Sequence, residues 1–481
     1  MKASLLSRWT AALLLLLPAL AFAAPLQLPP VDVAAALAAD AREPGLKPWR
    51  FAVGIPLQVT PQTHGQWTAL ADGRLRWTLQ VEAVDARSLN FGFTRYRLPP
   101  SARLWVRSLD DRERHGPYDA RHNAQGQLWT PVVRASQALI ELELLATEQA
   151  GLDLLLSQAG HGFRGFGTRD DAEGIPSKSG SCNIDVVCSE GDAWRDEIRS
   201  VARYTIGGLL LCTGQMVNNS AGDFTPYFLT ANHCLTTAAQ APTTVFYWNY
   251  ETSRCGGTPD GRLDQTQSGA VYLAGSGESS TIGADFTLLQ LLSEPDPAFR
   301  VYYAGWDARD IAPIGVTGIH HPAGDEKRIS VDVDPTFITA YGEAPDSPLS
   351  ALRPTHLMIV DWDRGVTEGG SSGSGIWNAE RRLVGQLSGG ASSCEAPDAP
   401  DWYGRMYSNF NDVPTPLTSL GFWLDPVGGT AVLDGADPQA PAGGGGSGGG
   451  PSDAGGGGGG ALHPLMLLTL LLALRRRARG R

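Results

Sequence analysis

Lysine is scarce in this 481-residue sequence. Lys2, Lys47, Lys178 and Lys327 are the only lysines among the 38 basic residues, so arginine supplies nearly all the positive charge. Acidic residues number 50, which gives a net charge of −12. An acidic chain of this kind repels the phosphate backbone, so we expect no nucleic-acid partner.

Nucleotide-binding sequences are also missing. The chain has neither a P-loop nor a Gly-x-Gly-x-x-Gly sequence after a strand, so we expect no nucleotide cofactor. His320 and His321 are adjacent, and neighbouring side chains on a strand point to opposite faces. We therefore expect structural roles for this pair, and we predict no cofactor and no metal site.

Cysteine is absent from the first 181 residues, and all six cysteines fall between Cys182 and Cys394. An even number confined to one region predicts disulfides formed in an oxidising compartment. Spacing alone leaves all 15 pairings of six cysteines open.

The N-terminus has the pattern of an export signal. Lys2 and Arg8 precede an apolar run over residues 11–20, and small residues surround Ala23. This predicts a signal peptide at 1–23 that signal peptidase removes. A retained anchor is the alternative, but the run is shorter than the roughly 20 residues of a membrane span. We expect a secreted or cell-surface protein.

The C-terminus has a second targeting pattern. Residues 437–460 are a glycine-rich linker that cannot bury a core, and residues 461–474 are apolar. Arginines then follow to Arg481. The tail 461–481 resembles the bacterial GlyGly-type sorting signal, which implies transient membrane attachment and removal by an intramembrane sorting protease. An ordinary tail anchor is the alternative.

Residues 24–178 form the first predicted domain. Apolar residues alternate with polar ones from Leu75 to Ala83, and again from Ile140 to Leu144, which is typical of half-buried antiparallel strands. Residues 161–178 are rich in Gly, Asp, Ser and Arg without periodicity, and we expect an exposed connector there. A β-rich module of this kind is either a propeptide or a binding domain for carbohydrate or protein.

Residues 179–436 form the second predicted domain. Short apolar segments at 227–230, 286–292, 357–360 and 383–387 are separated by Gly, Pro, Asn and Asp turns. This favours many short strands in a sandwich or barrel over helices, so we predict an all-β fold.

Three short sequences in this domain have the ingredients of acyl transfer. They are LTANHC with His233, ADFTLL with Asp285, and GGSSGSG at 369–375 with Ser372. A serine hydroxyl needs an imidazole to take its proton and a carboxylate to orient that imidazole. The glycines let the backbone N–H groups of Gly370 and Ser372 both point at a developing oxyanion.

The order His, Asp, Ser resembles that of the trypsin-like serine proteases. More narrowly, four further segments resemble the bacterial lysyl endopeptidases: GSCNIDVVC at 180–188, HHP at 320–322, GQL at 385–387 and SSC at 392–394. This resemblance covers 179–436. It implies a double antiparallel β-barrel preceded by a separate β-rich propeptide domain.

The resemblance also implies specific residue roles. The family's disulfides would join Cys182 to Cys394, Cys188 to Cys255 and Cys212 to Cys234. Asp401 matches the acid at the base of the primary specificity pocket, and Ser388 and Gly390 lie at substrate-binding positions.

Some positions depart from the related families. Trypsins carry an Asp six residues before the nucleophile and another immediately before it, where this chain has Val366 and Ser371. The lysyl endopeptidases can place a Trp and a His beside the active site, where this chain has Tyr341 and Ser388. Glu368 is expected to be a solvated loop charge.

The sequence thus predicts an exported serine endopeptidase that cuts after lysine, made as a precursor and cleaved between Lys178 and Ser179. Its partners would be lysine-containing proteins or peptides and its own propeptide. An enzyme that prefers arginine, or accepts both cations, is one alternative. A catalytically silent binding protein on a protease scaffold is another, and cleavage near Arg169 by a different protease is the alternative for maturation.

Overall fold

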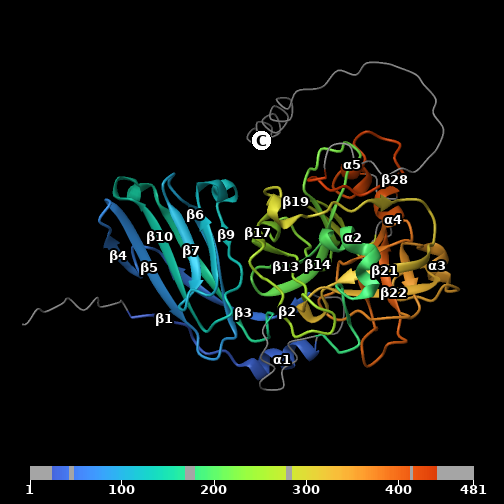
Figure 1. Ribbon diagram of the computed structural model, residues 1–481, viewed down its shortest axis with the longest axis horizontal. Helices are drawn as coiled ribbons and strands as arrows, with labels where there is room; N and C mark the ends of the chain where they lie inside the picture. Colours follow the sequence, from blue (N-terminus) through green and yellow to red (C-terminus); the bar gives the residue numbers. More distant parts are fainter. Residues whose placement is uncertain (1–23, 43–47, 168–178, 278–283, 412–414, 441–481) are drawn as a thin grey trace, which may run out of the picture. The chain divides into compact units, whose positions relative to one another are not determined.

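The computed structural model describes residues 24–42, 48–167, 179–277, 284–411 and 415–440 (Figure 1). The expected signal peptide, Lys178 and the tail 461–481 lie outside these residues. The described residues up to Gln439 form one compact unit. Within the described ranges, no helix is both long enough and apolar enough to cross a membrane.

The N-terminal part is a β-sandwich whose two sheets share one apolar core (Figure 1). The first sheet contains β1 (Leu26–Gln27), β4 (Gln66–Ala69), β5 (Arg74–Glu82), β7 (Arg103–Ser108), β8 (Arg114–Tyr118) and β10 (Gln137–Leu145). The second contains β3 (Ala52–Val59), β6 (Ser88–Arg97), β9 (Leu128–Trp129) and β11 (Asp153–Gly162). All pairings in both sheets are antiparallel except that of β1 with β5.

The alternating segments form the strands that the sequence predicts. Trp77 and Leu79 of β5 pair antiparallel with Leu142 and Ile140 of β10, and all four side chains are buried. The polar residues between them are partly exposed. A period of two places every second side chain on the core face, and the prediction of half-buried antiparallel strands is confirmed.

The expected exposed connector is wrong for residues 161–167. His161 belongs to β11, and Phe163 and Phe166 are fully buried. Glycine here permits close strand approach, because a side chain at Gly162 would overlap Ser88 of the paired strand β6. The glycines of this segment therefore serve close strand contact and do not mark a loop.

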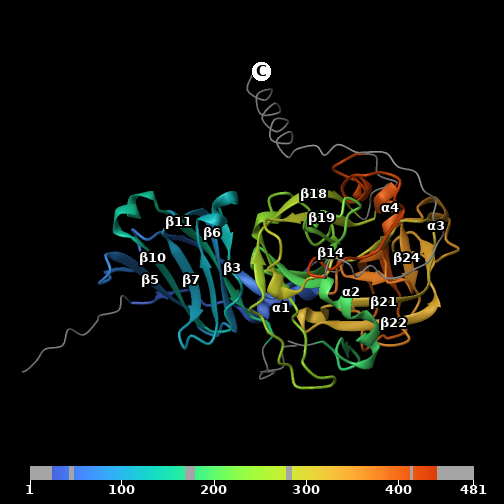
Figure 2. The same ribbon diagram turned by 45° about the horizontal axis from the view of Figure 1, so that its top comes forward.

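The C-terminal part contains two curled, largely antiparallel sheets (Figure 2). The first has β13 (Val201–Ile206), β14 (Leu210–Val217), β15 (Tyr227–Ala231), β16 (Thr244–Trp248), β17 (Thr266–Ser268), β18 (Ala270–Ser276) and β19 (Phe286–Leu291). The second has β12 (Ile184–Asp185), β20 (Trp306–Asp307), β21 (Ile314–His320), β22 (Arg328–Pro335), β23 (Phe337–Thr339), β24 (His356–Ile359), β25 (Gly375–Trp377), β26 (Leu383–Gly390), β27 (Asp401–Arg405) and β28 (Val432–Leu433).

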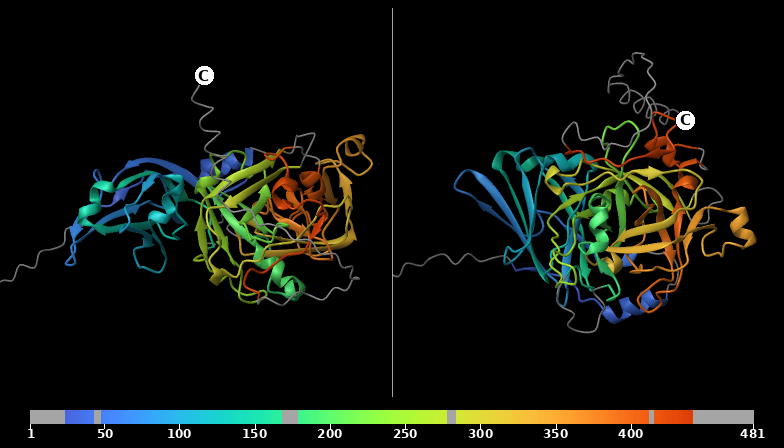
Figure 3. Two further views of the ribbon diagram at one scale, coloured as in Figure 1. Left: turned by 90° about the horizontal axis from the view of Figure 1, so that it is seen from above. Right: turned by 45° about the vertical axis from the view of Figure 1, so that its right-hand side comes forward.

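Helices in the described residues are short and lie between or beside the strands (Figure 3). The α-helices are α1 (Val33–Arg42), α2 (Arg195–Ser200), α3 (Pro348–Leu352), α4 (Met406–Asn411) and α5 (Leu420–Leu424). The 3-10 helices are η1 (Ala120–Gln125), η2 (Ala146–Gly151), η3 (Ser189–Trp194), η4 (Ala241–Thr243), η5 (Pro297–Phe299) and η6 (Pro322–Gly324). The all-β, trypsin-like two-barrel fold is therefore confirmed.

Each curled sheet encloses its own apolar cluster, and a further cluster joins the two sheets. Phe228 and Phe246 belong to the cluster of the first sheet, and Leu357 and Tyr403 to that of the second. The joining cluster combines residues from both sheets, among them Leu229 and Trp377. Burial of these side chains fixes one sheet against the other.

All six cysteines form disulfides. Cys182 is joined to Cys394, Cys188 to Cys255 and Cys212 to Cys234, with Cα–Cα distances of 5.6, 4.8 and 6.3 Å. These are the pairs that the resemblance implies.

A short strand from the N-terminal part joins the first sheet of the C-terminal part. The strand β2 (Trp49–Arg50) pairs antiparallel with β14, with Leu211 opposite Trp49 and Leu210 opposite Arg50. Beside it, a shared apolar cluster contains Phe51 and Phe166 from the N-terminal part and Tyr247 and Tyr250 from the C-terminal part. The two parts therefore have separate cores and a common contact.

Candidate active site

His233 and Asp285 meet because their strands are paired. His233 lies just beyond the end of β15, and Asp285 lies just before β19, which runs antiparallel to β15. The backbone N–H of His233 donates to Asp285 Oδ1 at 2.9 Å, and His233 Nδ1 lies 2.8 Å from Asp285 Oδ2. The Asp285 carboxylate is buried, and the imidazole is 8% exposed. An imidazole held in this way presents Nε2 for proton transfer.

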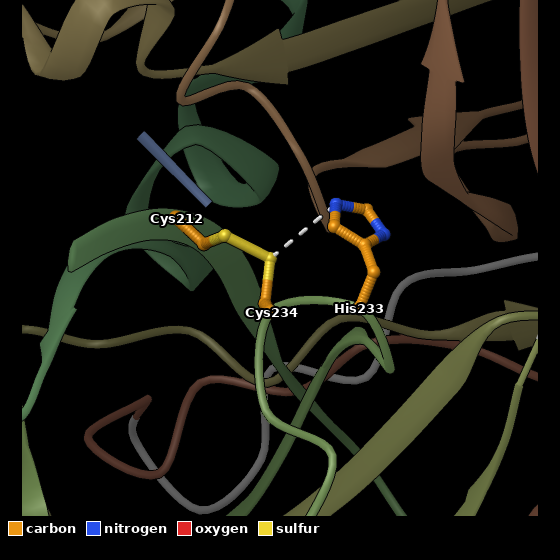
Figure 4. Close-up of side chains that lie close together, drawn as sticks. All are labelled: Cys212, His233 and Cys234. Carbon is orange, nitrogen blue, oxygen red and sulfur yellow. Dashed lines mark hydrogen bonds between the residues drawn. A yellow bond between two sulfur atoms is a disulfide. The ribbon is translucent and has the colours of Figure 1, made fainter. Parts of the chain in front are cut away.

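A disulfide supports the histidine. Cys234 follows His233 and is bonded to Cys212 of β14, and its Sγ lies 3.8 Å from His233 Nε2 (Figure 4). These three side chains are close enough together to suggest a metal site. A cysteine binds zinc as its thiolate, however, and both sulfurs here are consumed by the disulfide.

The glycine-rich loop at 369–375 leaves two N–H groups available. Gly369 O accepts from Ala323 N at 2.6 Å, and Ser371 O accepts from Ser374 N at 3.0 Å. In a trans peptide the N–H points away from the carbonyl, so the N–H groups of Gly370 and Ser372 face the other way. Within the described residues, neither donates to a protein acceptor. Such a pair can bind an oxyanion.

Thr213 of β14 holds the same loop against the first sheet. Its hydroxyl donates to Gly370 O at 2.9 Å, and its backbone N–H donates to Ser372 O at 2.9 Å. Gly373 has φ of +83°, and a side chain there would overlap Thr230 Oγ1 and Thr213 O. The close approach therefore requires glycine at 373.

Ser372 and His233 both lie close to the sulfur of Cys234. The sulfur of Cys234, the next residue after His233, is 3.8 Å from Ser372 O. Among the described residues, no hydrogen bond joins Ser372 Oγ to the His233 ring. Bonds of this kind are often loose in an enzyme without substrate and tighten in the substrate complex.

His320 contacts the glycine-rich loop, a partner that the sequence did not reveal. Its Nδ1 lies 2.8 Å from Ser371 Oγ, and its Nε2 lies 3.0 Å from Ser330 Oγ. Burial lowers the pKa of His320 to about 3, so the ring is neutral. The neutral imidazole therefore holds the hydroxyl of Ser371, the residue next to Ser372. His321 lies apart from this contact, stacked on Tyr250, so the expected structural roles fit both rings.

Asp401 is a buried carboxylate with one oxygen left unpaired. Oδ2 accepts from Trp362 Nε1 and Thr367 Oγ1, each at 2.8 Å, whereas Oδ1 accepts no hydrogen bond of good geometry in the described structure, although the backbone N–H and hydroxyl of Ser392 lie near enough to lower the pKa of this carboxyl group. Burial raises the pKa of Asp401 to about 6. Neither Trp362 nor Thr367 could be found from the sequence, because no local pattern connects them to Asp401.

Gly390 and Ser388 lie on β26 near Asp401. Gly390 pairs with Asp401, and a side chain at Gly390 would overlap the unpaired Oδ1. Ser388 is buried, and its Oγ lies 3.1 Å from Nε2 of His356. The His356 ring is 5.5 Å from that of Tyr341. A histidine therefore lies beside Tyr341, like the histidine that the lysyl endopeptidases can place beside a tryptophan. In this chain it is His356 of β24, and position 388 is a serine.

Glu368 is not the solvated loop charge that the sequence predicts. Its carboxylate accepts from the backbone N–H of Gly180 at 3.0 Å and from Asn183 Nδ2 at 3.1 Å. Burial raises its pKa. The residue fastens residues 180–183 to the segment that leads into the glycine-rich loop.

A family match and a curated relative both indicate that the chain is similar to lysyl endopeptidases. The family described as "Lysyl endopeptidase, C-terminal domain" matches residues 176–404. A lysyl endopeptidase of Pseudomonas aeruginosa is 32% identical over 408 residues, covering 77% of this chain and 80% of that protein.

Two solved protease structures are also similar. The Rv3671c protease in its inactive form is 14% identical, with a TM-score of 0.29, covering 47% of this chain and 93% of its own. The HtrA-type protease AlgW with tripeptide is 16% identical, with a TM-score of 0.29, covering 45% of this chain and 60% of its own.

The family match and the lysyl endopeptidase of Pseudomonas aeruginosa define the chain as a serine endopeptidase, whose substrates are proteins or peptides. The alternative of a catalytically silent binding protein is not favoured. The chain belongs to the lysyl endopeptidase family.

Replacing Gly373 by alanine should destabilise the protein by about 3 kcal/mol or more, because a steric overlap adds to the strain of a positive φ. Thermal unfolding measures the effect. Gly342→Ala is the matched control, since Gly342 also has positive φ but open space around it. The control should lose only about 1–2 kcal/mol. Equal losses in the two variants would contradict the close approach at Gly373.

Proposed function

We propose that the protein hydrolyses peptide bonds on the carboxyl side of lysine, with His233, Asp285 and Ser372 as the catalytic triad. The observation that carries the specificity is the unpaired, buried Oδ1 of Asp401. An unpaired buried charge costs several kcal/mol, and a substrate ammonium would remove that cost. The matching relative is named a lysyl endopeptidase, which supports the same assignment.

In the proposed mechanism, Ser372 Oγ attacks the carbonyl carbon while His233 Nε2 takes the hydroxyl proton. The resulting oxyanion accepts hydrogen bonds from the N–H groups of Gly370 and Ser372. The imidazolium gives its proton to the leaving amine, which leaves an acyl-enzyme at Ser372. Water then attacks the acyl carbon while His233 Nε2 takes its proton, and the ester bond breaks as that proton returns to Ser372 Oγ and the acid product leaves. Asp285 accepts the hydrogen bond from His233 Nδ1–H throughout.

Lysine is favoured over arginine because of how Asp401 is enclosed. Trp362 and Thr367 already occupy Oδ2, so one oxygen remains for the substrate. A single oxygen suits a compact ammonium, whereas a guanidinium forms its best contacts with both oxygens of a carboxylate. Preference for arginine, or for both cations, is the second candidate, since one carboxylate attracts either charge.

The burial of the only lysine between Ser179 and Arg481 also supports the proposed cleavage after lysine. Lys327 is fully buried, and its Nζ donates to Ile198 O at 2.7 Å. A lysine-directed protease beginning at Ser179 would find no accessible lysine on a folded copy of itself.

We further propose that residues 24–178 are a propeptide that covers the active site until cleavage after Lys178. Trp49 of β2 pairs with Leu211, the residue before Cys212. A side chain atom at Gly369 would lie 2.6 Å from the Trp49 ring, so that ring packs on the glycine-rich loop. An extended substrate and β2 would therefore compete for the same strand edge.

Export through the signal peptide 1–23, and transient membrane attachment through the tail 461–481, complete the proposal. Signal peptidase and an intramembrane sorting protease would act at the two ends. The mass of the protein released by its host would locate both cuts.

Asp401→Asn should lower kcat/KM for lysyl peptides by at least ~100-fold, because an amide cannot pair with the ammonium. Activity on a peptide with an uncharged residue before the cut should change much less. Assays of the wild type on matched lysyl and arginyl peptides test the second candidate, which is a preference for arginine or for both cations. Equal turnover of the two would overturn the lysine preference without affecting the endopeptidase assignment.

The preference for lysine should itself depend on pH. Because burial raises the pKa of Asp401 to about 6, the carboxylate is ionised above that pH and protonated below it. The ratio of kcat/KM for a lysyl peptide to that for an uncharged analogue should therefore fall as pH decreases through about 6. Protonation of the catalytic triad changes kcat/KM for both peptides by the same factor, so its effect cancels in this ratio. Asp401→Asn should give a flat ratio, and a flat ratio in the wild type would exclude Asp401 as the charge partner.

The precursor should be unable to cleave itself when Ser372 is replaced by alanine, and wild-type mature protein should begin at Ser179. Lys178→Gln should retain the propeptide and reduce peptidase activity by about tenfold or more. Adding Trp49→Ala to Lys178→Gln should restore part of that activity. Trp105→Ala is the matched control, because Trp105 contacts Arg114 within the sandwich. Restoration by both tryptophan variants would argue against a specific role for Trp49.

A further inference from the structure

Asp285 has a backbone conformation that requires external support. Its φ is +51°, a left-handed value that costs a non-glycine residue about 1–2 kcal/mol. Both hydrogen bonds described for its carboxylate go to His233. The position of the carboxylate therefore depends on what holds the backbone of Ala284 and Asp285.

Asp285 O accepts from the backbone N–H of Asn232 at 2.9 Å, and two buried amide side chains hold the preceding residue, Ala284. Asn409 Oδ1 accepts from the backbone N–H of Ala284 at 2.8 Å. Gln386 Nε2 donates to Ala284 O at 2.7 Å and more weakly to Asp285 O at 3.4 Å. The two amides are joined to each other, because Asn409 Nδ2 donates to Gln386 Oε1 at 3.0 Å. Gln386 and Asn409 thus form a continuous bridge, which we call the amide clamp.

The amide clamp connects the two sheets of the protease part. Gln386 lies on β26 and Asn409 on α4, whereas Ala284 and Asp285 lead into β19 of the other sheet. Gly404 of β27 leaves room for it, since a side chain at Gly404 would overlap both Ala284 O and Gln386 Nε2. The same strand β26 carries Ser388 and Gly390.

Packing alone does not account for the amide clamp. Both side chains are fully buried, and burying an amide costs free energy that an apolar side chain avoids. Every polar atom of the two amides has a partner, as a fully satisfied buried network requires. Such networks fix geometry more sharply than apolar contacts do.

We propose that Gln386 and Asn409 are positioning residues that hold the Asp285 carboxylate against His233 from the opposite sheet. They act through the backbone of Ala284 and Asp285 and do not touch the substrate. The inference rests on the proposed role of Asp285 in the triad. Loosening the amide clamp should impair the chemical step without weakening substrate binding.

The test uses Gln386→Met, which keeps the length of the side chain but removes its donor. Its kcat on a lysyl peptide should fall about 10- to 100-fold, in line with the cost of misplacing a catalytic group, and KM should stay within about twofold. Titration with a serine-directed phosphonate normalises kcat to folded active sites. Gln215→Met is the matched control, because Gln215 is equally buried but its amide has no described partner. Its kcat should stay within about twofold of wild type.

Asn409→Leu provides a second route if Gln386→Met folds poorly. It should lower kcat similarly, and the double variant should lose less than the product of the two single losses, because both residues act in one bridge. The far-downfield proton resonance of His233 Nδ1–H should also shift in either variant and not in Gln215→Met. Unchanged kcat and an unchanged resonance in both clamp variants would overturn the proposal.

The same series separates this inference from the proposed function. A wild-type enzyme that is inactive on lysyl peptides, or a Ser372→Ala variant that stays active, would refute the proposed function itself. An active wild type with active clamp variants would refute only the amide clamp. A fall in kcat accompanied by an equal rise in KM would assign Gln386 to substrate binding instead.

Discussion

The apolar contact between the two curled sheets is the constraint on which the active site depends. His233 and Asp285 come from the first sheet, whereas the glycine-rich loop and Asp401 come from the second. Leu229 and Trp377 belong to the buried cluster that joins the sheets. Hydrophobic burial has no direction, so it brings the surfaces together without fixing the groups on them to within a hydrogen-bond length.

Polar contacts across the same boundary supply that accuracy. Thr213 of the first sheet holds the carbonyls of Gly370 and Ser372, and Gln386 of the second sheet holds the carbonyl of Ala284. Each sheet therefore fixes a backbone segment of the other. Directional bonds in a low-dielectric interior fix geometry to within tenths of an ångström, which apolar packing does not.

Much of the fold could be predicted from the sequence, because its signals are local. The alternation around Trp77 and Ile140 gives strands, and the short motifs at His233, Asp285 and Ser372 point to the candidate site. The supporting residues His320, Gln386 and Asn409 could not be found in this way. Their partners lie 51, 102 and 125 positions away along the chain, and contacts at such distances leave no local pattern. The strand and buried residues within 161–167 are also not predictable in this way, because glycine marks both turns and close strand contacts.

The burial of Lys327 has a consequence for handling the enzyme. Its ammonium lies inside the fold, and burial lowers its pKa. A chain beginning at Ser179 therefore presents a single reactive amine to the solvent, its own N-terminus. A reagent that couples amines to a solid support would attach every molecule through the same point. The support would thus hold all copies in one orientation, fastened by the end of the chain that leads to Cys182.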